Sequence, residues 1–310
     1  MATQQSTQVN KFVGLTKIEV ADKQLGITFP MFVMYPTDVP SRDVVFGPYI
    51  LNVSPDAPVE VGNFPLVIIS HGSGGSNLAY HTLGSHLAKN GFVVCMPEHP
   101  FNNRNDNHLE GTNENFTNRL KHISLMIDQM FLADKFKQYL QPNNVGVIGH
   151  SIGANTALVL VGGHPIPYAE YQIKFGKPMH MEQEPQEINL KTDNRIKALV
   201  LFALTPGWFT GHESLKNVNI PVLIFNAEKD EYIPCSHVEI FIKGLKKDSS
   251  ISCHIVKNAG HFSFLSPFPE SIKAMAGVAA MDPEGFNREK FHQELNVEVL
   301  NFLKKTLCQQ

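Results

Sequence analysis

A serine flanked by glycines is the residue of this sequence best placed for covalent chemistry. Ser151 stands in a Gly-x-Ser-x-Gly pattern, after the apolar run 145–148 and before the small-residue run 154–160. This order predicts a strand, a tight turn and a helix, with the serine at the apex. Gly149 and Gly153 are small enough to keep the expected strand and helix from colliding. Because a helix N-terminus also favours developing negative charge, we predict that Ser151 is a nucleophile.

A serine hydroxyl is a weak nucleophile at neutral pH. It needs a base, a carboxylate that orients the base, and donors for the oxyanion that forms. Asp230 follows the strand-like run 220–226, and His261 follows the strand-like run 251–256. Folds that place a nucleophilic serine on a turn between a strand and a helix have their catalytic residues in this chain order, serine, then acid, then histidine. We therefore predict that His261 takes the proton of Ser151 and that Asp230 holds the imidazole.

Other residues compete for the roles of acid and base. Glu228 and Glu231 are near enough in sequence to replace Asp230, which could instead cap a surface turn. His254 lies inside the last expected strand and is a weaker candidate base than His261, which could itself be a structural histidine.

A glycine-rich stretch, His-Gly-Ser-Gly-Gly at 71–75, directly follows the apolar run 65–70. Glycines let backbone N–H groups approach a substrate closely, as an oxyanion hole requires. We predict that the N–H groups of Ser73 and Ile152 hold the oxyanion. A flexible turn is the alternative; a phosphate cradle is disfavoured because the Gly-Lys-Ser/Thr ending is missing.

The substrate pocket is expected at the same edge of the sheet. Loops 97–112, 162–194 and 205–215 are the segments expected to shape it. Five side chains near the predicted catalytic residues are candidates for its lining, and they are His71, His150, Trp208, Phe209 and Phe262. Ordinary packing is an equal alternative for Trp208.

Apolar runs alternate with helical patterns from residue 65 onward, which predicts a mostly parallel sheet with helices on both faces. Ligand chemistry in such sheets collects at the carboxyl ends of the strands. Short β-prone runs before residue 36 predict an N-terminal antiparallel ribbon, and 36–64 reads as an irregular connection with room for one extra strand. We expect one domain over 1–310, with 162–194 inserted at the carboxyl edge. Long helices are expected over 113–139 and from Asp282 to the end.

Composition excludes several classes of function. The chain has 310 residues, of which 43% are hydrophobic and 18% charged, and its net charge is −3. Without a basic face, nucleic-acid binding is not expected. The polar residues 1–10 lack an apolar core, so neither a signal peptide nor a membrane segment is expected. The histidines have no metal-like spacing, so we expect neither a metal nor another cofactor.

The four cysteines, Cys95, Cys235, Cys253 and Cys308, are scattered without the spacing of a disulfide framework. We therefore expect a reduced, cytoplasmic protein that acts on a small molecule. The oligomeric state is left open.

Together these motifs resemble the α/β-hydrolase superfamily from about Pro65 to the C-terminus. The resemblance is carried by Tyr-Pro-Thr at 35–37, the glycine-rich stretch, the serine motif, Asp230 and His261. It looks closest to the dienelactone-hydrolase-like and platelet-activating-factor-acetylhydrolase-like branch. This resemblance implies ester hydrolysis through an acyl-enzyme. The dienelactone enzymes use a cysteine where this chain has Ser151, so their particular reaction does not transfer.

The sequence thus predicts a serine hydrolase that cleaves a small carboxylic ester. An amidase or peptidase acting on a small peptide-like compound is the main alternative. A hydrolase fold kept only for binding is less favoured, because such chains usually lose part of the serine, acid and histidine set. An interfacial lipase is also less favoured, because no strongly apolar lid is evident.

Overall fold

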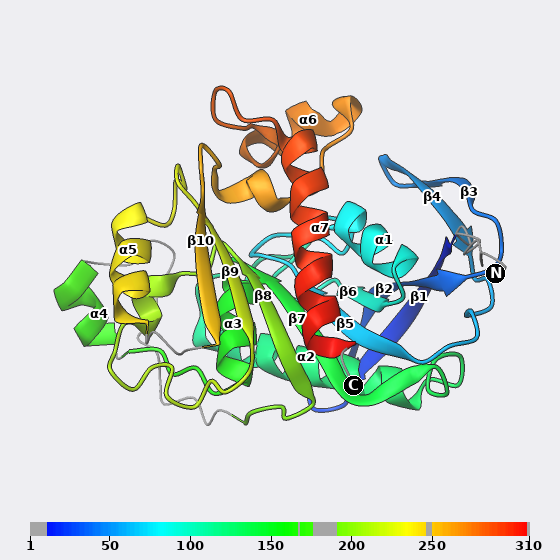
Figure 1. Cartoon of the computed structure of the whole chain (residues 1–310), viewed down its shortest axis with the longest axis horizontal. Helices are drawn as coiled ribbons and strands as arrows, with labels where there is room; N and C mark the ends of the chain where they lie inside the picture. The colour runs from blue at the N-terminus through cyan, green and yellow to red at the C-terminus, as the bar shows by residue number, and fades with distance from the viewer. Residues whose placement is uncertain (1–10, 167, 176–190, 246–249, 309–310) are drawn as a thin grey trace, which may run out of the picture.

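The computed structural model describes residues 11–166, 168–175, 191–245 and 250–308. In these residues ten strands form a sheet in the order β10-β9-β8-β7-β5-β6-β2-β1-β4-β3 (Figure 1). The strands are β1 Phe12–Asp22, β2 Ile27–Thr37, β3 Arg42–Phe46, β4 Tyr49–Pro55, β5 Phe64–Ser70, β6 Val93–Pro97, β7 Leu140–His150, β8 Ile196–Phe202, β9 Val222–Ala227 and β10 Ile251–Val256. The α-helices are α1 His81–Lys89, α2 Asn113–Leu132, α3 Ile152–Leu160, α4 Tyr168–Phe175, α5 Cys235–Gly244, α6 Glu270–Ala276 and α7 Arg288–Leu307.

Strands β5 to β10 pair in parallel and form the centre and one side of the sheet. Every residue of β5 is buried, which explains why its sequence is an unbroken apolar run rather than an alternating one. Because the parallel strands share one direction, their carboxyl ends lie at one edge. The residues that follow β5, β7, β9 and β10 therefore meet there.

Helices cover both faces of the sheet (Figure 1). Helices α1 and α7 contact one another and one face, whereas α2 and α3 contact one another and the opposite face. Two apolar clusters result, one under α1 and α7 and the other under α2 and α3. This arrangement confirms the predicted fold class.

The N-terminal ribbon is also confirmed, and it is longer than predicted. β1 and β2 pair antiparallel from end to end, and β2 joins the ribbon to β6. The expected irregular connection after it holds two strands, because β3 and β4 form a hairpin whose last pair is Phe46 with Tyr49. Tyr49, Leu51 and Val53 of β4 are buried, whereas Ile50 and Asn52 between them are exposed, which is the alternation of a half-buried strand.

Two predicted helix limits are wrong. Helix α2 ends at Leu132, because Ala133 adopts an extended backbone and the chain turns toward β7. Helix α7 begins at Arg288, where the side chain of Asn287 accepts a hydrogen bond from the N–H of Lys290. Asp282 does not start this helix; its carboxylate accepts hydrogen bonds from Arg288 instead.

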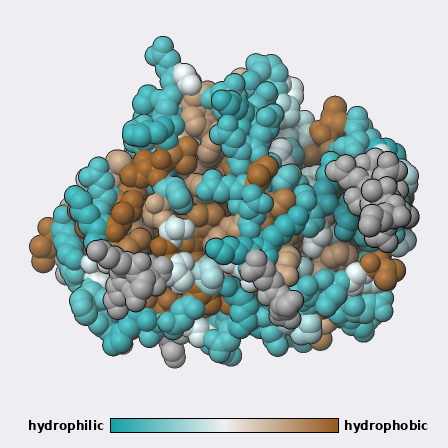
Figure 2. All heavy atoms as spheres, in the orientation of Figure 1, coloured by the Kyte–Doolittle hydropathy of each residue, from teal (hydrophilic) through white to brown (hydrophobic). Residues whose placement is uncertain are grey.

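The expected insertion at 162–194 lies partly outside the described residues. Its described part contains α4 and a backbone hydrogen bond from Ile166 to the carbonyl of Trp208 at 2.7 Å. The face seen in Figure 2 is mostly hydrophilic, with hydrophobic atoms gathered in patches between the elements. None of the helices in the described residues combines the length and apolar character needed to cross a membrane.

Candidate active site

Ser151 lies on a strained turn between the end of β7 and the start of α3. Its φ of 55° and ψ of −123° lie where L-residues are uncommon. The turn is tight: a Cβ on Gly149 would lie 2.4 Å from the carbonyl oxygen of Gly153, and one on Gly153 would lie 2.3 Å from that of Ser70. Both positions therefore require glycine. The N–H of Ser151 donates to the carbonyl of Phe202 at 2.9 Å, which ties the turn to β8.

Asp230 and His261 form a hydrogen-bonded pair at the ends of β9 and β10. The Nδ1 atom of His261 lies 2.8 Å from Oδ2 and 3.1 Å from Oδ1 of Asp230. The carboxylate also accepts the N–H groups of Tyr232 and Ile233, at 2.9 and 2.8 Å, and its side chain is only 1% exposed. Because an ionised carboxylate only accepts, Nδ1 carries the proton and Nε2 is left as the basic nitrogen.

The competing carboxylates have other partners. Glu228 accepts from Lys257 Nζ at 2.7 Å and from the N–H of Asn258 at 2.8 Å. Glu231 accepts the backbone N–H of His261 at 3.0 Å, so it holds the main chain of the histidine and not its ring. The structure therefore joins the imidazole of His261 to Asp230. His254 is exposed on the edge strand β10, where its ring lies against Phe225.

His150, the residue before Ser151, holds the backbone of His261 from the other side. Its Nε2–H donates to the carbonyl oxygen of His261 at 3.0 Å. Burial and the neighbouring His261 keep the pKa of His150 well below its usual value, so its ring stays neutral. A Cβ on Gly72 would lie 3.0 Å from the other ring nitrogen of His150. A side chain at position 72 would therefore have to displace the imidazole of His150 or shift itself by a few tenths of an ångström.

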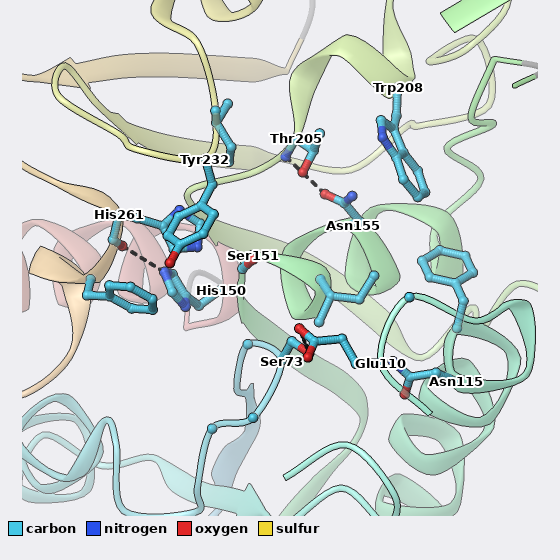
Figure 3. A pocket seen from close by; sticks show the side chains of 18 of the residues that line it. Ser73, Glu110, Asn115, His150, Ser151, Asn155, Thr205, Trp208, Tyr232 and His261 are labelled. Carbon is cyan, nitrogen blue, oxygen red and sulfur yellow. Dashed lines mark hydrogen bonds between the residues drawn. The ribbon is translucent and has the colours of Figure 1, made fainter. Parts of the chain in front are cut away.

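Ser151 and His261 line one cavity of about 340 Å³ (Figure 3). In that view Ser151 lies between His150, Tyr232 and His261 on one side and Asn155 and Trp208 on the other. Within the residues described, no hydrogen bond joins Ser151 Oγ to His261. Such catalytic contacts often tighten only when substrate is bound.

The glycine-rich loop after β5 forms another wall of this cavity. Gly72 and Ser73 line it, and a Cβ on Gly72 would lie 3.3 Å from Cβ of Ser151. In the described part of the chain, the N–H of Ser73 has no hydrogen-bond acceptor. The N–H of Ile152 is the first of α3, where no intrahelical acceptor exists. Both residues line the cavity that Ser151 lines, and their role as oxyanion donors stays a prediction.

Three of the five expected pocket side chains, His150, Trp208 and Phe262, line the cavity. The structure places the other two elsewhere. His71 is 1% exposed and lies behind the loop, where its Nδ1–H donates to the carbonyl of Gly72 and its Nε2 accepts the N–H of His99. Phe209 is 2% exposed and packs in the apolar core, because its short 3-10 helix turns it away from Trp208.

Aromatic and apolar side chains dominate the rest of the lining. Phe116 and Trp208 stand at a ring-centroid distance of 6.2 Å on one side of Ser151. Tyr171 of α4 adds to the lining, which also includes Tyr80, Tyr232, Ile233, Phe262 and Leu265. Glu110 is the single acidic or basic side chain, histidines aside, among the lining residues that the structure describes.

Comparisons with known proteins agree with this fold. A family model described as alpha/beta hydrolase fold matches residues 65–171. No curated protein matches the sequence. A solved structure, the ferulic acid esterase from Streptomyces cinnamoneus, is similar with a TM-score of 0.67 and 17% identity, covering 98% of this chain and 92% of that chain. The chain has the α/β-hydrolase fold.

The finer resemblance, to the dienelactone-hydrolase-like and acetylhydrolase-like branch, stays a prediction. In this α/β-hydrolase fold the predicted nucleophile, acid and histidine each follow a parallel strand, as their chain order indicated. The comparisons do not test the roles of these residues.

Sequence reasoning missed several residues of the site. Tyr80 and Phe116 lie on the cavity wall, and Glu110 accepts a hydrogen bond from Ser73 Oγ at 2.9 Å. Arg119 and Asn102 lie buried behind the glycine-rich loop of this α/β-hydrolase fold. In sequence, Arg119 falls in an amphipathic helix pattern in which an arginine is expected to face solvent, so no signal marked it.

Proposed function

We propose that this protein is a serine hydrolase that cleaves small carboxylic esters through an acyl-enzyme. Ser151 Oγ attacks the carbonyl carbon while its proton passes to Nε2 of His261. The negative charge that forms on the carbonyl oxygen is held by the N–H groups of Ser73 and Ile152. The imidazolium then gives its proton to the leaving alcohol, and the acyl group stays on Ser151.

The second half of the cycle reverses these roles. His261 takes a proton from a water molecule, and the hydroxide attacks the acyl carbon. The C–O bond to Ser151 breaks, the proton returns to Ser151 Oγ, and the carboxylic acid is released. Asp230 keeps Nδ1 protonated throughout and stabilises the imidazolium in both steps.

One observation carries the proposal: Ser151, on its strained turn, lines the same cavity as a histidine that is hydrogen-bonded to a buried aspartate. A histidine with a purely structural role needs neither a buried acid at Nδ1 nor a place on the wall of a cavity beside a serine. The similarity to a protein named as an esterase also favours ester hydrolysis.

The cavity lining supports neutral, largely apolar substrates of moderate size. Aromatic side chains on both sides of Ser151 offer apolar surface, and a cavity of about 340 Å³ suits a small ester. The carboxylate of Glu110 lies on the wall beside the predicted oxyanion loop. The carboxylate of Glu110 would repel a negative charge on the substrate. We therefore infer that esters whose acyl group carries a carboxylate are poor substrates.

The test is hydrolysis of chromogenic esters with acetyl, butyryl and benzoyl groups by wild type and Ser151→Ala. We expect kcat to fall by about 10⁴-fold or more in the variant. Turnover close to wild type in Ser151→Ala would overturn the proposal. An ester and an amide of the same acyl group, compared in wild type, separate esterase from amidase activity.

A further inference from the structure

Arg119 is a buried cation with an unusual set of partners. It lies on α2, its side chain is 0% exposed, and it points at the base of the glycine-rich loop. Its Nη1 donates to the carbonyl oxygen of His71 at 2.8 Å, and its Nη2 to that of Gly72 at 3.2 Å. Its Nε donates to Oδ1 of Asn102 at 2.7 Å. None of these acceptors is a carboxylate.

Keeping this charge inside the protein is costly. Burial lowers the pKa of Arg119 to about 9, so the guanidinium is still a cation at neutral pH. A buried charge without an opposite charge destabilises the folded state unless its N–H groups are well bonded. A residue needed only to fill space would be apolar at this position. The charge and its planar geometry therefore call for a role beyond packing.

The role follows from the geometry of the peptide bond. In a trans peptide the carbonyl oxygen and the N–H of the next residue point in opposite directions. The carbonyl of Gly72 and the N–H of Ser73 belong to one peptide unit. Three donors hold the Gly72 oxygen on the side away from the Ser73 N–H: Nη2 of Arg119, Nδ1–H of His71 and the N–H of Gly75. Of these, Arg119 also binds the next carbonyl back along the chain, that of His71. Holding the oxygen in this way turns the Ser73 N–H toward the cavity, which Ser73 lines.

We propose that Arg119 is a positioning residue of the oxyanion hole, which it helps to align by binding the carbonyl oxygens of His71 and Gly72. This inference rests on the proposed esterase function. The same contact draws electron density toward the carbonyl oxygen, which makes the N–H of Ser73 a stronger donor. Arg119 touches neither the substrate nor Ser151 in this role; it acts through the loop.

Asn102 connects Arg119 to the side chain of Ser73. Its Oδ1 accepts from Arg119, while its Nδ2 donates to Ser73 Oγ at 2.8 Å. The loop of Asn102 is also paired with the glycine-rich loop through a bridge between Gly75 and Asn103. Arg119 thus fixes Ser73 twice, through its peptide unit and through its side chain.

The experiment compares Arg119→Lys with wild type on one ester substrate. Lysine keeps the charge but cannot hold two carbonyl oxygens and an amide with one planar fork. We expect kcat to fall by about 10- to 100-fold with KM changed by less than about threefold, the pattern of a lost transition-state contact. A trifluoromethyl ketone that forms a tetrahedral oxyanion on Ser151 should lose affinity by a similar factor.

Arg195→Lys is the matched control. Arg195 also braces α2, through Asp128 and the carbonyl of Ser124, but it lies away from the cavity lining. We expect its kcat to stay at the wild-type value even where its thermal stability falls. The acid limb of the pH–rate profile should be unchanged in both variants, because neither touches His261 or Asp230.

A purely structural role predicts a different result, namely lower thermal stability in Arg119→Lys with unchanged kcat and unchanged ketone affinity, and that result would overturn the inference. If the variant does not fold, Asn102→Ala tests the same support and should lower kcat with little change in KM. An unchanged kcat in a folded Asn102→Ala would also contradict it. Failure of the proposed function is distinguishable, because wild type would then hydrolyse no ester or Ser151→Ala would remain active.

Discussion

Nδ1 of His261 lies 2.8 Å from Oδ2 of Asp230, although 31 positions separate the two residues in the chain. The two residues meet because β9 and β10 are parallel neighbours and end at the same edge of the sheet. The hydrogen bond fixes the proton on Nδ1 and leaves Nε2 free to act as a base. The contact makes Asp230 essential to the proposed chemistry without placing it on the cavity wall.

Replacement of Asp230 by asparagine should therefore lower the activity while keeping a side chain of similar size beside His261. An amide donates as well as accepts, so it can stabilise the tautomer with the proton on Nε2, which cannot take a proton from serine. We expect kcat for an ester to fall by about 10³- to 10⁴-fold. Glu228→Gln is the control, because Glu228 bonds Lys257 and Asn258 and should leave kcat unchanged. Equal effects of the two substitutions would contradict the assignment of Asp230.

The turn at Ser151 predicts a sharp difference between two glycine substitutions. A Cβ on Gly153 would lie 2.3 Å from the carbonyl oxygen of Ser70, so Gly153→Ala must displace α3 from β5. We expect it to lower the free energy of unfolding by about 3 kcal/mol or more, or to prevent folding. Gly244→Ala meets no atom within 4 Å and should leave the stability unchanged or slightly raised. Thermal unfolding of the two variants checks this, and equal melting temperatures would argue against the tight packing of the turn.

Glu110 should set the charge preference of the proposed esterase. Its carboxylate lies on the cavity wall and accepts a hydrogen bond from Ser73 Oγ. We expect wild type to prefer a neutral acyl group over a carboxylate-bearing one of the same length, and Glu110→Gln to reduce that preference by about 10-fold. The measurement is the ratio of kcat/KM for butyryl and hemisuccinyl esters of one alcohol. An unchanged ratio in the variant would remove Glu110 from substrate selection.

Buried histidines should make the fold sensitive to mild acid. Burial lowers the pKa of His71 and His122 to about 3 and that of His292 to about 4, with Arg119 adding to the effect at His71 and His122. Below about pH 6.5 the unfolded chain binds protons that the folded chain excludes, so stability present above that pH is lost as the pH falls toward these values.

Each such histidine should lower the free energy of unfolding by up to about 1.4 kcal/mol per pH unit. Urea unfolding between pH 7 and pH 5 measures this slope. His292→Gln should reduce the slope of the free energy of unfolding against pH by the contribution of one histidine. This reduction is expected whatever the substitution does to the stability at pH 7. A free energy of unfolding that is the same at pH 7 and pH 5 would contradict the neutral, buried state of these residues.

The residues that follow the ends of parallel strands were the part of the candidate site that the sequence predicted best. The residues Ser151, Asp230 and His261 each follow an apolar run, and parallel strands place such residues at one edge. The support behind them was not predictable, because it depends on three-dimensional packing. Arg119 has no sequence feature that distinguishes it from a solvent-facing arginine, and its partners are main-chain carbonyls.

The helix limits and the β3–β4 hairpin were not predicted correctly, for two different reasons. Asp282, Pro283 and Glu284 have the composition of a helix start, yet Asp282 is bonded to the side chain of Arg288 and the helix is capped by Asn287. Tertiary contacts decided between two adequate caps. The hairpin was missed because its two strands are short and lie in a segment rich in proline and aspartate, although Gly47 and Pro48 between them mark the turn.

Covalent labelling can decide whether Ser151 is a nucleophile that His261 activates. A fluorophosphonate probe, followed by mass spectrometry of the digested protein, identifies the residue that carries the adduct. We expect one adduct, on the peptide that contains Ser151, which is lost in Ser151→Ala and forms much more slowly in His261→Gln. Labelling of another residue, or undiminished labelling of Ser151→Ala, would contradict it.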